Sequence, residues 1–199
     1  MNNQPLYFID LLITSCDLPK DPLTIAEVIS FEVSREETLR KIIELARCDF
    51  NSRSWNCNVN SKVHAELENP VGLNTIGMLL DRLSILVIKK TVNKIEVDME
   101  LDAQIDEMMR AINNCQKGFS STFNKITLIK NKNSLDNVAD ITMHLAFVNL
   151  LLWLAQDVLY LRGAGSLANQ ELRDYIDYFA NKNILRNQLI SKLASYWHS

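Results

Sequence analysis

The chain has 199 residues, of which 47% are hydrophobic and 23% charged, and its formal net charge is −3. This length and apolar content suffice for one domain with a sizeable core. Five glycines and four prolines are few for such a length and disfavour a turn-rich β fold. The Lys and Arg residues are scattered among acids, so the sequence lacks the basic patch expected of a protein that binds nucleic acid or anionic lipid.

Apolar residues at helical spacing predict a series of helices from the N-terminus onward. A short helix is expected over residues 7–16. The Asp-Pro pair at 21–22 suits the start of a second helix, with Asp as N-cap and Pro at the first helical position. Ser34 followed by Glu37 has the spacing of a capping box and predicts a further helix start. Residues 51–62 are polar and rich in Asn, which predicts a loop.

The middle of the chain allows two interpretations. Asn74 or Thr75 can cap a helix that follows, and residues 75–117 contain no proline and a single glycine. This stretch forms either one long helix or two helices joined near residues 95–102. Residues 119–137 are expected to continue as helix and then to fray in a Lys/Asn-rich loop.

The last third of the sequence predicts two long helices. Residues 136–165 form an apolar segment ended by Gly163, and residues 167–197 form an amphipathic one. The chain is therefore expected to be an all-α bundle of five to seven helices with long central antiparallel helices. We treat it as a single helical domain, in which the N-terminal helices and loop of residues 1–60 pack on a bundle core of residues 70–199.

The cysteines indicate a reducing environment. Cys16, Cys48, Cys57 and Cys115 include no CxxC pair and have no His at metal-ligand spacing, so we expect reduced thiols and no metal. No segment reaches about 20 apolar residues without a polar break, so no transmembrane helix is expected. The N-terminal apolar stretch has no basic region before it, which disfavours a signal peptide. The sequence thus predicts a cytoplasmic protein.

Polar residues interrupt the two most apolar segments. In residues 75–90, Asp81 lies on the side opposite the broad Leu face, and Ile85 and Ile88 share that side. Because apolar residues lie on both sides of this helix, both sides are expected to pack against other helices, which places Asp81 in a partly buried seam. In residues 142–160, one stripe contains Asn149 and Trp153, with Asp157 at its edge.

Two interpretations of these residues stay open. In the first, Asp81 pairs with an Arg of another helix and Asn149 bridges helices, which fixes the register of the bundle. In the second, a polar cleft uses Asp81 and Asp157 as acids or cation ligands, Trp153 as a stacking wall, and basic side chains as anion contacts. The candidate ligand-binding residues are Asp81, Arg82, Lys89, Asn149, Trp153, Asp157, Asn183 and Arg186. No phosphate loop, nucleophile elbow or HExxH motif is present, so no residue is assigned a catalytic role.

Three segments resemble one bacterial family. "TIGMLLDRLSILVIK", "HLAFVNLLLWLAQDVLYLR" and "NKNILRNQLI" are similar, in order and spacing, to segments of domain-of-unknown-function family 4254, and together they cover about residues 70–190. Gln156 stands where that family usually has Glu. The resemblance implies a helical protein often encoded near cell-surface polysaccharide genes, with no assigned reaction. The family's characteristic positions fall on Asp81, Arg82, Lys89, His144, Asn149, Trp153, Asp157, Asn183, Arg186 and Asn187.

Two functions of different classes follow. The first is a non-enzymatic interaction or assembly module whose partner is a second copy or another helical protein. The second is a small-molecule binding protein or enzyme, for a nucleotide or nucleotide sugar, with a polar cleft between helices; the sequence specifies no cofactor. Neither involves nucleic acid or a membrane. Geometry separates them: a cleft needs side chains that converge on solvent, whereas a register network needs side chains that satisfy one another in a dry interface.

Overall fold

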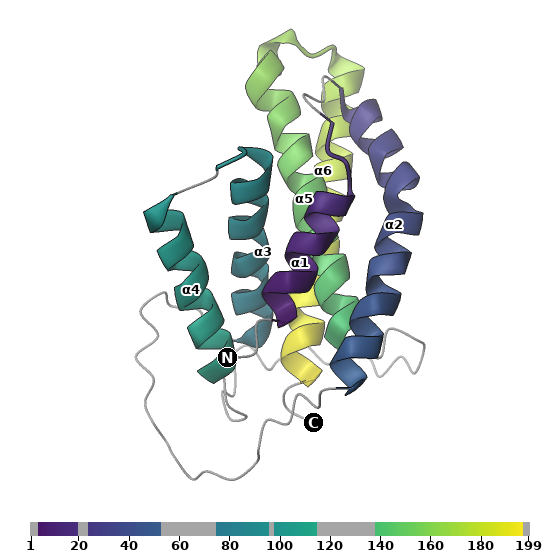
Figure 1. Ribbon diagram of the computed structural model, residues 1–199. Coiled ribbons are helices and arrows are strands. Elements are labelled where there is room, and N and C mark those ends of the chain that lie inside the picture. The colour runs from purple at the N-terminus through teal and green to yellow at the C-terminus, as the bar shows by residue number, and fades with distance from the viewer. Residues whose placement is uncertain (1–3, 20–23, 53–74, 96–97, 115–137, 197–199) are drawn as a thin grey trace.

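A computed structural model describes most of the chain as a helical bundle (Figure 1). The described residues are 4–19, 24–52, 75–95, 98–114 and 138–196. The regular elements in them are α1 (Gln4–Ser15), α2 (Ile25–Ser52), α3 (Ile76–Val92), α4 (Met99–Asn114), α5 (Val138–Arg162), the 3₁₀ helix η1 (Ala164–Ser166) and α6 (Asn169–Tyr196). Within these residues there is no strand, and the predicted all-α bundle is confirmed.

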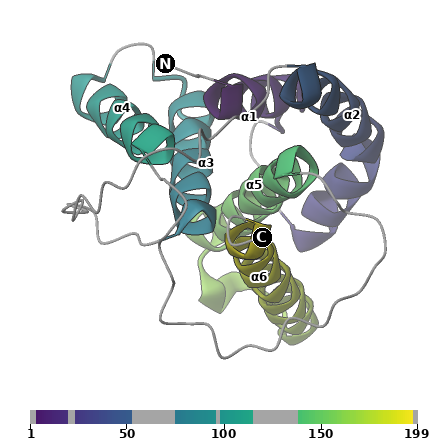
Figure 2. The same cartoon turned by 90° about the horizontal axis from the view of Figure 1, so that it is seen from below.

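The apolar helix α5 lies at the centre of the bundle. It packs against α1, α2, α3 and α6, which surround it when the molecule is viewed from below (Figure 2). Its side chains from Ile141 to Ala155 are almost all buried, because every side of this helix meets another helix. One core cluster contains buried residues from each of the six α-helices.

By length and composition alone, α5 is apolar enough to cross a membrane. In the structure, 83% of its most apolar 18-residue window is buried among the other helices. The buried central helix of a bundle can be as apolar as a membrane span, so this apolar run is weak evidence for a span.

Helix α4 lies at the edge of the bundle and packs mainly against α3 (Figures 1 and 2). Its buried residues form one apolar stripe that includes Leu101, Ile105 and Met108. The chain turns between α3 and α4, so the two-helix interpretation of residues 75–117 is the one that holds. Lys90 near the end of α3 donates to Asp102 in the first turn of α4, at 2.5 Å, and links the two helices at their half-exposed edge.

Short polar side chains define where three of the helices begin. The Thr24 hydroxyl accepts from Glu27 N–H, and Glu27 accepts from Thr24 N–H, which is a reciprocal capping box at the start of α2. Thr75 caps α3, as the sequence indicated, through a 3.2 Å hydrogen bond from Met78 N–H. Asp98 accepts from Glu100 N–H and Leu101 N–H at the start of α4.

The predicted helix start at Ser34 is wrong. Ser34 lies inside the continuous helix α2, and its hydroxyl donates to the Phe31 carbonyl at 2.8 Å instead of capping a helix. The predicted loop over 51–62 is also wrong at its beginning, since α2 extends to Ser52. The predicted helix start at residues 21–22 lies outside the described residues, which resume at Thr24. The predicted fraying helix over 119–137 also lies outside them, since they resume at residue 138.

The two long C-terminal helices that the sequence predicted are present and form a hairpin. Gly163 follows the last residue of α5 with φ +76°, a left-handed conformation that glycine adopts without a steric penalty. Its N–H donates to the Leu159 carbonyl at 2.7 Å and completes the last turn. Across this turn, Arg162 donates to Glu171 of α6 at 2.7 and 3.3 Å. The pKa of Glu171 is lowered by these hydrogen bonds.

Candidate functional site

The candidate site begins with the close approach of α3 to α6. A Cβ added at Gly77 would lie 2.3 Å from the Ile190 carbonyl oxygen, so only glycine fits at this contact. One turn further along α3, Asp81 faces Arg186, which lies one turn back along α6. The matching steps of four residues in opposite directions show that the two helices are antiparallel here.

Asp81 and Arg186 form a bidentate ion pair in this interface. The Arg186 Nε donates to Asp81 Oδ1 at 2.7 Å, and Nη2 donates to Oδ2 at 2.5 Å. Asp81 is 8% exposed, and the Arg186 side chain is 27% exposed. Both carboxylate oxygens are therefore engaged by one planar guanidinium, which is the strongest geometry available to such a pair.

Asn149 joins the third helix, α5, to this pair. Its Nδ2 donates to Asp81 Oδ1 at 2.9 Å and to Ser84 Oγ at 2.7 Å. The Ser84 hydroxyl in turn donates to the Asp81 carbonyl at 2.8 Å. Asn149 and Ser84 are 4% and 0% exposed. We call Asp81, Ser84, Asn149 and Arg186 the polar cluster; it ties together α3, α5 and α6.

The electrostatics of the polar cluster are those of a closed network. Burial of a carboxylate costs several kcal/mol unless a cation and further donors replace its water shell. Arg186 supplies the cation and Asn149 an additional donor. The hydrogen bonds to Asp81 raise the pKa of Arg186, against the opposing effect of burial. Across the described residues, no buried side-chain nitrogen or oxygen lacks a hydrogen-bond partner.

The prediction that Asp81 lies in a seam and pairs with an Arg of another helix is confirmed. Ile88 is fully buried and Ile85 is partly buried, as expected if both sides of α3 pack against other helices. Asn149 bridges helices as expected.

The remaining candidate residues have different surroundings. Arg82 and Lys89 are exposed on the outer side of α3, and Asn187 is exposed on α6. Asn183 donates to the Phe179 carbonyl of its own helix at 3.0 Å. Trp153 is partly buried against the apolar core, and Asp157 is half-buried. The polar stripe of α5 thus contributes Asn149 to the polar cluster, while Trp153 packs as a core residue.

The sequence analysis also missed polar contacts between helices, and two of these involve α2. Asp140 of α5 is 1% exposed and accepts from Arg47 of α2 at 2.6 and 2.5 Å, again in a bidentate pair. Asp140 lies in the first turn of α5, where an acid is expected on any helix, so its burial could not be recognised from the sequence.

The second missed contact joins α2 to α6. Glu32 of α2 accepts from the Tyr178 hydroxyl at 2.9 Å and from the Lys182 ammonium. Burial raises the pKa of Tyr178, and the nearby charge of Glu32 adds to the effect. Glu32 in the first third of α2 and Lys182 in α6 are 150 residues apart in the chain, and no sequence pattern links them, because the pairing depends on how the helices pack.

The part of the chain that the structure describes contains no group of three or more His, Cys, Asp or Glu side chains placed to hold a metal ion. Cys16 is a buried free thiol and Cys48 an exposed one, whereas Cys57 and Cys115 lie outside the described residues. His144 is engaged locally, since its Nδ1 lies 2.7 Å from the Asp140 carbonyl oxygen.

Comparison of the chain with protein-family models, with curated proteins and with solved structures finds no match. The resemblance to family 4254 therefore stays a prediction that rests on the three sequence segments. The geometry of the polar cluster is the strongest guide to what this chain does.

Proposed function

We propose that this chain is a non-enzymatic helical module for protein interaction or assembly. The observation that supports the proposal is the bidentate Asp81–Arg186 pair bridged by Asn149. Among the three candidate residues that come together, Arg186 donates twice to Asp81, and Asn149 donates to Asp81 and to Ser84. Such an arrangement fixes the register of α3, α5 and α6, which is a well-attested use of buried polarity in helical cores.

The other inter-helix contacts support the same interpretation. Arg47–Asp140 joins α2 to α5, Lys182–Glu32 joins α6 to α2, and Lys90–Asp102 joins α3 to α4. Polar pairs are thus distributed over several interfaces and do not converge on one. This distribution suits a rigid scaffold that presents its outer faces to partners.

The cellular setting belongs to the proposal as well. The free thiols of Cys16 and Cys48 support a reducing compartment such as the cytoplasm. The resemblance to family 4254 supports a bacterial origin and a role in assembling cell-surface polysaccharide. In this setting the module would bring proteins together and would not itself transform the glycan.

A ligand screen by thermal denaturation tests the proposal. The wild-type chain and Asp81→Asn are melted with divalent metals, nucleotides and nucleotide sugars, each at high concentration. A ligand present at 100 times its Kd adds about 2.7 kcal/mol of stability and is easily detected. We expect no ligand to raise the wild-type melting temperature through the polar cluster. A ligand that stabilises the wild type and not Asp81→Asn would contradict the proposal and favour a binding site.

A further inference from the structure

Helix α6 has an unusual distribution of charge around its axis. Lys182 and Arg186 turn inward, to Glu32 and Asp81, with side chains only 15% and 27% exposed. Ile176 and Ile184 turn outward and are 54% and 57% exposed. Tyr175, Leu189 and Leu193 of the same helix are buried in the core, as expected, but two inward cations and two outward isoleucines depart from the usual pattern of a helix that faces water.

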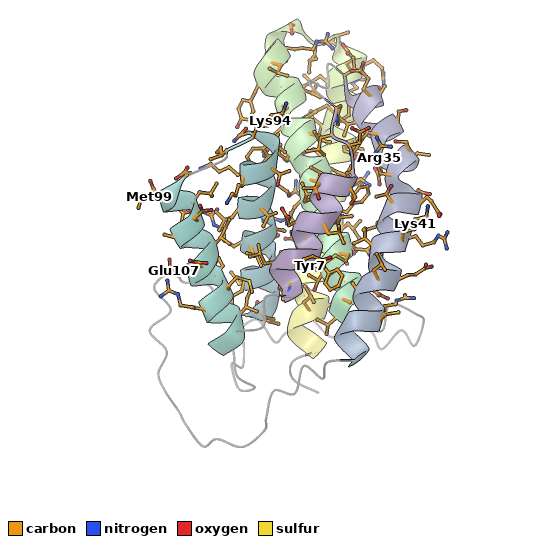
Figure 3. The ribbon with its side chains drawn as sticks, in the orientation of Figure 1. Tyr7, Arg35, Lys41, Lys94, Met99 and Glu107 are labelled. Carbon is orange, nitrogen blue, oxygen red and sulfur yellow. The ribbon has the colours of Figure 1, made fainter. Side chains whose placement is uncertain are left out.

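The outer face of α2 shows what a solvated face of this protein looks like. Its middle turns contain Glu37, Arg40, Lys41 and Glu44, which form ion pairs along the helix, and Lys41 points away from the bundle (Figure 3). The outer face of α6 differs: between residues 176 and 188 its exposed positions hold one charge, Asp177, together with isoleucine, leucine, alanine and amides. Depletion of charge at exposed positions is typical of the centre of an interface.

Three apolar residues of this face form a palindrome, and the exposed Leu185 lies beside them outside it. Ile176, Ala180 and Ile184 follow one another at intervals of four residues, with the small residue in the middle. Positions four apart form a ridge along a helix, and two such ridges interdigitate when helices cross at about −50°. A small residue at the crossing point allows the two backbones to approach.

We propose that two copies of this chain pair through the outer faces of α6, antiparallel, about a two-fold axis at Ala180. This inference rests on the proposed function and names the partner. A two-fold interface brings the same patch of each copy together, so a palindromic ridge is complementary to itself. Ile176 of each copy then comes to the level of Ile184 of the other, and both are covered.

Charge favours a second copy as the occupant of this face. About an axis at Ala180, Asp177 comes to the level of Asn183, and Arg173 comes to the level of Asn187. The carboxylate and the guanidinium therefore meet amides, and no like charges are opposed. Helix α6 lies at one side of the bundle of helices (Figure 2).

The oligomeric state tests the pairing. Light scattering during gel filtration should give the wild-type chain twice its monomer mass of 22.8 kDa. Ile184→Lys places an unpaired charge in the interface and should raise the dimer dissociation constant at least about tenfold. Leu45→Lys on α2 is the matched control, because Leu45 is 55% exposed, and it should leave the dimer intact. Circular dichroism checks that both variants fold.

A cysteine at the axis provides an independent readout. In a background with Cys48, Cys57 and Cys115 changed to Ser, Ala180→Cys should form an inter-chain disulfide on mild oxidation, since the axis brings both copies of residue 180 together. Val33 lies on α2 and is 63% exposed, and Val33→Cys in the same background should not form an inter-chain disulfide. A monomeric wild type, an unaffected Ile184→Lys dimer, or equal cross-linking of the two variants would overturn the pairing. None of these outcomes touches the proposed function, which the ligand screen tests separately.

Discussion

Gly77 and Asp81 occupy successive turns of α3 and serve the same contact with α6. Gly77 lets the backbones approach, and Asp81 then pairs with Arg186 across the interface. The seam position of Asp81 could be predicted, because apolar residues on both sides of its helix demand cover. The role of Gly77 could not, since it depends on how closely the Ile190 carbonyl approaches.

Gly77→Ala should destabilise the fold. The added Cβ would lie 2.3 Å from Ile190 O, so one backbone must move, at a cost of about 1–3 kcal/mol that exceeds the gain in helix propensity. Gly165→Ala is the control, because nothing lies within 4 Å of its Cβ position. Urea denaturation should separate the two variants; equal stabilities would show that α3 and α6 are not packed this closely.

The two described cysteines should differ sharply in reactivity. Burial raises the pKa of Cys16 to about 11 from its ordinary value of 9.0, and this side chain is fully covered, whereas Cys48 is exposed. A rise of two pKa units lowers the thiolate fraction at neutral pH about 100-fold. Alkylation of the native protein, followed by peptide mapping, should label Cys48 first and Cys16 only after denaturation. Equal labelling rates would place Cys16 at the surface.

At the scale of the element, sequence predicted the helices better than their starting points. Thr24–Glu27 and Ser34–Glu37 have the same capping-box spacing. The structure uses the first, and the second lies within one helix that runs from Ile25 to Ser52. No proline or glycine separates the two boxes, so the helix begun at the first continues through the second, and the Ser34 hydroxyl is satisfied by a carbonyl of the preceding turn.

Removing each hydroxyl distinguishes these two positions. Thr24→Ala should cost about 1 kcal/mol, because the N–H of Glu27 loses its acceptor at the start of α2. Ser34→Ala should change stability by less than about 0.5 kcal/mol, since alanine suits an exposed position inside a helix. Chemical denaturation measures both. A larger loss for Ser34→Ala would restore a helix start at that residue.

At the scale of the whole molecule, the all-α architecture followed from low glycine and proline content and from helical periodicity. The central position of α5 followed from its apolar composition on every side. The sequence did not predict the partners of all the polar residues of α5. Asn149 could be recognised because an amide is unusual among leucines, whereas Arg47–Asp140 and Glu32–Lys182 join ordinary charged residues far apart in the chain, and only packing brings them together.

A double-mutant cycle on Asp81 and Arg186 measures whether the polar cluster stabilises the fold. Asp81→Ala strands a half-buried guanidinium and should cost about 3 kcal/mol, toward the lower end for a broken buried pair because Arg186 keeps some contact with water. Asp81→Asn should cost less. With Arg186→Ala and the double variant, the cycle should give a coupling of about 1–3 kcal/mol. Additive losses within about 0.5 kcal/mol, or an Asp81→Ala variant as stable as the wild type, would contradict the structural role of the polar cluster.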